Sequence, residues 1–346
     1  MKSHHLSLLI LSLFMMGIAS STHISIIPHT HMLAASLSLG DPWSTIWMQS
    51  TAVSFNAIAA TADAVFVAGT TFDINDIVQS HVLLIKYSLE GEHLWNQTWD
   101  YSYNQAANAL SATTDALYLA GVTTTGLYGD NGLLVKMDYN GNQIWNVSYG
   151  TFPAEYFTSV AIGVDGVYVG GFVKYAGNYD VAALLVKFDF DGNELWTEKW
   201  DRANVSVGLD VAVGSNGIYL VGEYGAQWNG ASNNAFLAKY SLTGVQVWNT
   251  TYGGSGRDVS NAVSVFNDTI YVTGSTISFS NTESAELFLS QYRTCNVLPV
   301  HFCNDRYLDA GRTSRLAFVG VSTSSKTFFI QLSDHIEDAS SFFGLA

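Results

Sequence analysis

The stretch NGNQIWNVSYG (140–150) is one of four versions of the same phrase in this chain. The other versions are EGEHLWNQTWD (90–100), DGNELWTEKWD (191–201) and TGVQVWNTTYG (243–253). One more tryptophan precedes them at the same step, so the repeated tryptophans are Trp43, Trp95, Trp145, Trp196 and Trp248, spaced by 50 to 52 residues. Self-similarity at a period of this length is typical of repeat architectures. The repeat therefore decides the fold before any single motif does.

Two fixed offsets accompany the tryptophans. Each Trp is followed 26 residues later by the glycine that ends a run such as VYVGG, namely Gly69, Gly121, Gly171, Gly222 and Gly274. A lysine precedes the Trp by nine residues in four repeats, at Lys86, Lys136, Lys187 and Lys239. All variation in length thus falls between that glycine and that lysine. Each unit contains four short apolar segments separated by Gly, Asn and Asp turns, which predicts four antiparallel strands, here A to D.

Four antiparallel strands per repeat, without helical periodicity, predict propeller blades. We expect an all-β fold with a single β-propeller over residues 43–333. Its repeats are 43–94, 95–144, 145–195, 196–247 and 248–292, followed by a degenerate unit at 293–333. In that unit LAFVG (316–320) resembles a strand B and TFFIQLS (327–333) resembles a strand C. This makes six blades, and the first strand (43–49) would close the ring by completing the last blade. A seven-bladed ring and an incomplete ring are the alternatives.

The repeated tryptophans are expected to be structural. Neighbouring blades pack face to face, and a large flat side chain on each strand D can fill the wedge between them. The sequence therefore assigns Trp43, Trp95, Trp145, Trp196 and Trp248 to packing between blades and not to a ligand.

The K-x-D/S-x-x-G-x-x-x-W spacing and the [IV]Y[VL]xG strand resemble the bacterial and archaeal β-propeller repeat called SBBP, a relative of the PQQ-like repeats. The resemblance covers residues 43 to about 292, five times over. It implies an exported propeller of a prokaryotic cell surface or a secreted protein, and it names no catalytic residue.

The ends of the chain are predicted to lie outside the propeller. Lys2 and the apolar run 6–18 indicate a signal peptide over 1–21, followed by a spacer at 22–42, and a tail at 334–346 follows the last strand. No second apolar run is long enough to span a membrane. The formal net charge is −15, and it becomes −16 without Lys2, which makes nucleic acid an unsuitable partner. We expect a secreted or cell-surface protein whose partners are a glycan or an envelope protein.

Two features fit an exported protein. Cys295 and Cys303 are expected to form a disulfide, with two free thiols as the alternative. Sequons occur at Asn96, Asn146, Asn204, Asn249 and Asn267, where N-glycosylation is expected only if the source organism performs it.

Function is expected on the connections between strands B and C, because these alone vary in length on a rigid frame. They carry amphipathic aromatic residues suited to sugar stacking or protein recognition, namely Tyr128, Tyr175, Tyr179, Tyr224 and Trp228. The alternative is that these rings pack on the blade edges.

The sequence gives only weak indications of a metal, cofactor or catalytic site. No histidine or cysteine spacing suits a metal, no cofactor is predicted, and DYNGNQ and DFDGNE are better explained as hairpin turns than as calcium loops. Asp210 and Glu223 are weak catalytic candidates, because the other repeats carry no carboxylate at these places. They could flank a sugar, stay solvated, or pair with Arg202 or Lys239.

The sequence favours a non-enzymatic scaffold that binds a glycan or protein through the B–C face. The alternative is a secreted carbohydrate-active hydrolase or lyase that uses Asp210 and Glu223. A structural module of an envelope assembly is the third interpretation.

Overall fold

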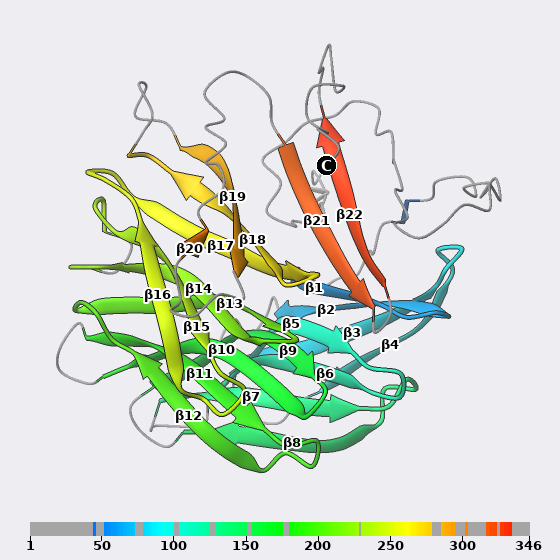
Figure 1. Ribbon diagram of the computed structural model, residues 1–346. Helices are drawn as coiled ribbons and strands as arrows, with labels where there is room; N and C mark the ends of the chain where they lie inside the picture. Colours follow the sequence, from blue (N-terminus) through cyan, green and yellow to red (C-terminus); the bar gives the residue numbers. More distant parts are fainter. Residues whose placement is uncertain are drawn as a thin grey trace, which may run out of the picture.

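The protein is all-β in its described part. The computed structural model describes residues 44–45, 52–72, 79–99, 104–124, 129–150, 154–175, 180–227, 230–278, 285–294, 302–303, 316–323 and 326–333. Every regular element in these ranges is a strand (Figure 1). None of the described residues belongs to a helix that could cross a membrane.

Four repeats fold into four-stranded antiparallel blades whose strands pair in chain order. The first blade comprises β1 (Ala52–Ala60), β2 (Ala64–Phe72), β3 (Ser80–Ser88) and β4 (His93–Trp99). The second comprises β5 (Asn104–Ala112), β6 (Leu117–Thr124), β7 (Asp130–Met137) and β8 (Gln143–Tyr149). The third comprises β9 (Ala154–Gly163), β10 (Gly166–Lys174), β11 (Val181–Phe188) and β12 (Glu194–Trp200). The fourth comprises β13 (Val205–Gly214), β14 (Gly217–Gly225), β15 (Asn234–Tyr240) and β16 (Gln246–Tyr252).

The chain beyond the fourth blade continues the pattern less regularly. A fifth sheet holds β17 (Asp258–Phe266), β18 (Thr269–Thr276), β19 (Glu286–Thr294) and the short β20 (Phe302–Cys303). The strands expected around 316–320 and 327–333 form the hairpin β21 (Leu316–Thr323) and β22 (Lys326–Ser333), and β21 contacts β1. The strand 43–49 lies outside the described residues except at 44–45, so closure of the ring and six blades stay predictions.

The first strand of each repeat is the innermost strand of its blade. The innermost strands β1, β5, β9, β13 and β17 contact one another in chain order, as propeller blades do (Figure 1). The outer strands β4, β8, β12 and β16 carry mostly exposed and half-buried side chains, apart from the buried Trp200 of β12, whereas β2, β6, β10 and β14 are mostly buried. This burial gradient places the hydrophobic core between the blades, as the sequence predicted.

Each inner strand contains a β-bulge opposite the glycine of strand B. In the second blade the register slips between Ala107 and Ala109, opposite Gly121. A Cβ on Gly121 would overlap the carbonyl oxygen of Ala106, which lies directly over it. The same overlap occurs at Gly69, Gly171, Gly222 and Gly274, each against a carbonyl of its own inner strand. The invariant offset of this glycine is therefore explained by a bulge that tolerates no side chain beneath it.

The residue added by the bulge connects successive blades. Asn56 Nδ2 donates to the carbonyl of Ala107 at 2.8 Å, and Asn108 Nδ2 donates to the carbonyl of Phe157 at 2.7 Å. Thr158 Oγ1 donates to the carbonyl of Gly208 at 2.9 Å in the third blade. Each bulge residue lies 13 positions after its repeated tryptophan, so the same step along the chain places a hydrogen bond at the first three blade boundaries.

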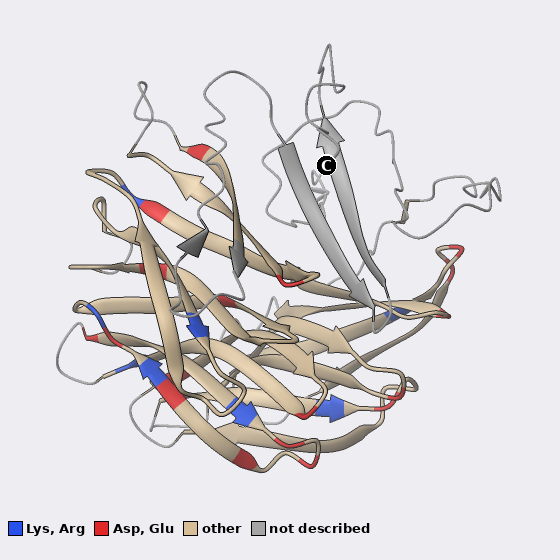
Figure 2. Ribbon diagram, in the orientation of Figure 1, with Lys and Arg blue, Asp and Glu red and all other residues tan. Residues whose placement is uncertain are grey.

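The repeated lysine and tryptophan join the blades nearer to the rim. Lys86 Nζ and Lys136 Nζ each donate at 3.0 Å to a carbonyl in the C–D turn of the next blade. Each ammonium also lies over the strand-B ring of its own blade, Phe66 at 5.3 Å and Tyr118 at 5.5 Å. Figure 2 shows that basic residues of the described strands are spread over several blades.

The tryptophans pack against glycines of the following C–D turn. A Cβ on Gly141 would lie 3.0 Å from the ring of Trp95, and one on Gly192 would lie 3.2 Å from the ring of Trp145. Gly244 stands in the same relation to Trp196. These three rings thus occupy the boundary between two blades. Trp248 packs near Tyr219, and Trp43 lies outside the described residues.

The two segments that hinted at calcium loops are hairpin turns. Asp138 Oδ1 accepts hydrogen bonds from the backbone N–H groups of Asn140 (2.9 Å) and Asn142 (2.8 Å). Asp189 makes the same two bonds in the next blade. The carboxylates therefore close the turn that Gly141 and Gly192 complete with positive φ.

We expect Gly121→Ala to lower the free energy of unfolding by about 2–4 kcal/mol, because the new methyl group must displace a backbone carbonyl of the inner strand. Chemical denaturation monitored by tryptophan fluorescence measures this loss. Val164→Ala, at a turn residue that is 96% exposed, serves as the control and should leave stability unchanged. Equal stability of Gly121→Ala and the wild type would contradict the proposed role of the bulge.

Candidate functional site between the second and third blades

The structure describes two of the five aromatic residues predicted to bind. Tyr224 packs edge-on against Trp200 with ring centroids 5.5 Å apart, and it belongs to the core between blades. Tyr175 accepts a hydrogen bond from Lys199 Nζ at 3.1 Å. No described contact joins these two rings. Tyr128, Tyr179 and Trp228 lie outside the described residues.

Asp210 is hydrogen-bonded within the fold through both of its carboxylate oxygens. Its Oδ1 accepts from Ser159 Oγ at 2.6 Å on the preceding inner strand, and its Oδ2 accepts from the Val263 N–H at 2.8 Å on the following one. One carboxylate thus links three blades. Removal from water raises the pKa of Asp210 to about 6, although these hydrogen bonds oppose the rise. In the fourth blade the bulge residue is Leu209, whose side chain cannot donate a hydrogen bond. Asp210 connects this blade to its two neighbours instead.

Glu223 is also occupied. Arg257 Nε and Nη2 donate to its two carboxylate oxygens at 2.9 and 2.7 Å, and Asn233 Nδ2 donates at 3.2 Å. The Glu223 side chain is 5% exposed. The sequence considered Arg202 or Lys239 as partners, and the structure corrects this to Arg257, which arrives from the connection before β17. Both carboxylates are thus hydrogen-bonded within the fold, and a catalytic role for Asp210 and Glu223 stays a prediction.

The remaining predicted positions are distributed over the surface. Asn96, Asn146, Asn204 and Asn267 are exposed, and the Asn249 side chain accepts a hydrogen bond from Arg202. Cys295 lies outside the described residues, so the expected disulfide to Cys303 stays a prediction. Among the described residues no group of three His, Cys, Asp or Glu side chains is placed to hold a metal ion.

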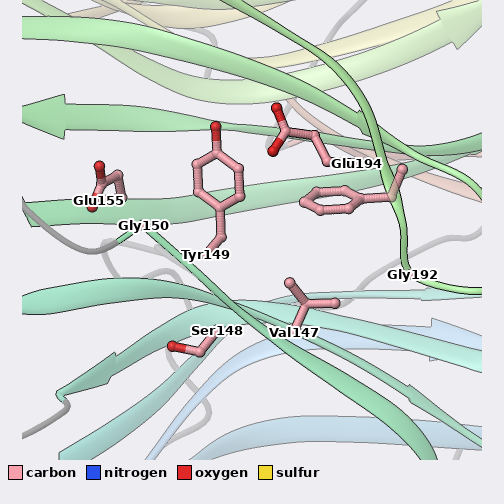
Figure 3. A pocket seen from close by; sticks show the side chains of 8 residues that line it. Val147, Ser148, Tyr149, Gly150, Glu155, Gly192 and Glu194 are labelled. Carbon is pink, nitrogen blue, oxygen red and sulfur yellow. The ribbon is translucent and has the colours of Figure 1, made fainter.

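A pocket of about 440 Å³ lies between the outer strands of the second and third blades (Figure 3). The lining residues are Val147, Ser148, Tyr149 and Gly150 from β8 and its end, Glu155 from β9, Phe188 from β11, and Gly192 and Glu194 at the start of β12. Figure 3 shows the Tyr149 ring between the carboxyl groups of Glu155 and Glu194. The sequence did not single out any of these residues as a site.

Glu155 is buried and incompletely bonded. The residue is 8% exposed, and Oε2 has no hydrogen-bond partner. Loss of water raises the pKa of Glu155 to about 7, and only the charge of Lys199 acts in the opposite direction. A buried carboxyl with an unused oxygen beside a pocket is a candidate for contact with a ligand.

The position of Glu155 in the repeat explains why it stands out. It lies ten residues after Trp145, and the residues at the same place in the other repeats are Val53, Gln105, Ser206 and Asp258, all of them buried. Asp258 accepts hydrogen bonds from Gly254 N, Thr276 Oγ1 and Ser278 Oγ, so its carboxylate serves the local loop. A comparison of this column along the sequence could have identified Glu155 as a candidate.

The opposite wall carries a chain of hydroxyl groups. Thr197 Oγ1 donates to Glu194 Oε1 at 2.7 Å, and the Tyr149 hydroxyl lies 2.8 Å from Thr197 Oγ1. Because the Thr197 hydroxyl donates its hydrogen bond to Glu194, the Tyr149 hydroxyl is the donor to Thr197. The pocket therefore combines aromatic rings with oxygen atoms that can accept further hydrogen bonds.

Comparisons with known proteins give a limited result. No protein-family model and no curated protein matches the chain. Solved structures similar to it include the parainfluenza virus 5 hemagglutinin-neuraminidase ectodomain, at 9% identity and a TM-score of 0.44, with 82% of this chain and 81% of that chain covered. The Listeria innocua β-1,2-mannobiose phosphorylase has 8% identity and a TM-score of 0.42, covering 64% and 87%. The Bacillus licheniformis GH43 endo-arabinanase has 12% identity and a TM-score of 0.36, covering 69% and 93%. At such values no function is transferred.

The ion pair of Glu223 can be tested for a structural role. Arg257→Met should cost about 2 kcal/mol of unfolding free energy, because it leaves a buried carboxylate uncompensated while the arginine itself is partly solvated. The double variant Glu223→Met/Arg257→Met should recover most of that loss in urea denaturation. Simple addition of the two single effects would contradict the coupling.

Glu155 should make stability depend on pH. Its pKa is raised from 4.5 to about 7 in the folded chain, so its contribution is complete below pH 4.5 and is lost as pH rises through about 7. Glu155→Gln should therefore melt at a higher temperature than the wild type at about pH 8 and at a similar one at about pH 4. Differential scanning calorimetry measures both.

The control for this experiment is Glu198→Gln, which removes a charge from β12 outside the pocket. It should retain the pH dependence of the wild type. A Glu155→Gln variant whose melting temperature falls with pH as steeply as that of the wild type would show that this carboxyl is not the titrating group.

Proposed function

We propose that this protein is an exported or cell-surface β-propeller that binds a glycan on the face carrying the B–C connections. The observation that supports this is the contrast between the two ends of the blades. The B–C connections span 73–79, 125–129, 175–180, 226–233 and 277–285, and they differ in length from five to nine residues. Variable connections on a frame fixed by hydrogen bonds between blades are suited to recognition.

The opposite ends of the blades are short and uniform. The described A–B turns contain two to four residues and the C–D turns four or five. Several are closed by side-chain hydrogen bonds, as at Asp138 and Asp189. They therefore offer little variation for recognition, and the aromatic residues of the B–C side remain the stronger candidates. We also propose that the repeat is of the SBBP type, on the spacing of its Lys, Gly and Trp residues.

A carbohydrate-active hydrolase or lyase is the second candidate. The names of two of the neighbours above describe enzymes of carbohydrate metabolism, and this candidate would share the ligand class of the first. Its carboxylates would be Asp210 and Glu223, which accept hydrogen bonds from Val263 and Arg257 within the fold. Turnover of a bound glycan therefore separates the two candidates.

The test is a glycan array probed with the full chain beside Trp228→Ala and Tyr179→Ala. We expect binding to a carbohydrate that falls about ten-fold or more in these variants, because stacking of a sugar on an aromatic ring is lost. Phe190→Ala, an exposed aromatic in a C–D turn, is the matched control and should bind like the wild type. Absence of glycan binding would redirect the search to envelope proteins as partners.

A further inference from the structure

The pocket between the second and third blades presents oxygen acceptors and aromatic surface. Its two charged lining residues are the carboxylates Glu155 and Glu194, and no lysine or arginine belongs to the lining. Phe188 and Tyr149 supply rings at the same place, with centroids 5.9 Å apart. A ligand that complements this pocket must carry positive charge and must also present a surface that packs against aromatic rings.

The hydrogen-bond donors and acceptors of the lining restrict the chemical class of the ligand further. Glu155 Oε2 is buried without a hydrogen-bond partner, and Tyr149 donates its proton to Thr197, so both oxygens can still accept a hydrogen bond. Ser148 Oγ already accepts from Asn131 Nδ2 at 3.0 Å. Its proton is the one hydroxyl donor that the described lining can still offer. A sugar hydroxyl needs both donors and acceptors, whereas an ammonium or guanidinium group only donates.

We propose that this pocket binds a primary ammonium or guanidinium group, which donates to Glu155 Oε2 and Tyr149 Oη and lies against the rings of Tyr149 and Phe188. Such a cation gains charge-assisted hydrogen bonds and contact with aromatic faces. The pocket is separate from the residues expected to bind on the B–C connections, so this inference stands or falls independently of the glycan proposal.

The surroundings of Glu155 give the site a dependence on pH. Lys199 on β12 and Tyr149 on β8 act on Glu155, and Glu194 on β12 lies on the other side of the Tyr149 ring. Lys199 is engaged with Tyr175 and does not line the pocket. Protonation of Glu155 turns its acceptor into a donor and removes its charge, so the cation should be released as pH falls below about 7.

The repeat supplies variants that are compatible with the fold. Glu155→Gln installs the residue found at the same place in the second blade, Gln105. Glu194→Gln installs the residue of the neighbouring outer strands, Gln143 and Gln246. Both changes remove one negative charge while keeping shape, and Glu198→Gln removes a charge from the same strand outside the pocket.

The experiment is isothermal titration calorimetry of the full chain with n-butylammonium, with n-butanol as its neutral counterpart. We expect butylammonium to bind at about pH 8 and to lose about ten-fold or more in affinity at about pH 5, because the buried charge is neutralised. Glu155→Gln should lower affinity at pH 8 by a similar factor, Glu194→Gln should lower it less, and Glu198→Gln should not change it.

Three results would overturn the proposal. They are no binding of butylammonium to the folded wild type, equal binding of butanol, and unchanged affinity in Glu155→Gln. Far-ultraviolet circular dichroism of each variant confirms that it is folded before titration. Parallel titrations with methylguanidinium and with a blocked single-lysine peptide identify the source of the cation. Tighter binding of the peptide supports a protein side chain, and equal binding supports a free amine.

Discussion

The propeller depends on a steric constraint, the absence of a side chain at one position in the second strand of each repeat. The carbonyl of the bulged inner strand occupies the space where a Cβ of Gly69, Gly121, Gly171, Gly222 or Gly274 would stand. Without this space the inner strand could not bulge, and the extra residue would not turn toward the next blade. The hydrogen bonds of Asn56, Asn108 and Thr158 follow from it. Each of these contacts between blades thus depends on two residues 13 positions apart, the bulge residue and the glycine of strand B.

Much of this architecture could be predicted from the chain alone. Fixed spacings of Lys, Gly and Trp determine strand order and the type of fold, because they reflect contacts that recur at every blade boundary. The bulge was not foreseen, since no local pattern distinguishes Asn108 from any other polar residue on a strand. The expected strands at 316–320 and 327–333 form a hairpin. Closure of the ring could not be predicted from the repeat, because the chain after residue 292 no longer follows its fixed spacings.

The candidate site was harder to predict, for a different physical reason. Asp210 and Glu223 attracted attention as departures from the repeat, but a departure can equally compensate for another one. Leu209 cannot donate from the bulge, and Asp210 restores the connection between blades. Glu223 neutralises Arg257, a residue distant in sequence. Glu155 lies at a repeat position that is polar in several blades, so its residue type alone does not mark it as a site. It differs from Asp258, the other carboxylate at this position, in having an oxygen without a hydrogen-bond partner.

The side-chain donors of the bulge residues and of the repeated lysines point forward along the chain, whereas at the fourth boundary the Val263 N–H donates back to Asp210. Asn56, Asn108 and Thr158 donate forward to the next blade, and so do Lys86 and Lys136 near the rim. A blade that forms during synthesis therefore meets a predecessor whose donors are already in place. Assembly from the N-terminus satisfies each boundary as the following blade arrives, and it never requires a finished blade to reopen. The direction of these bonds makes the order of translation a usable order of folding.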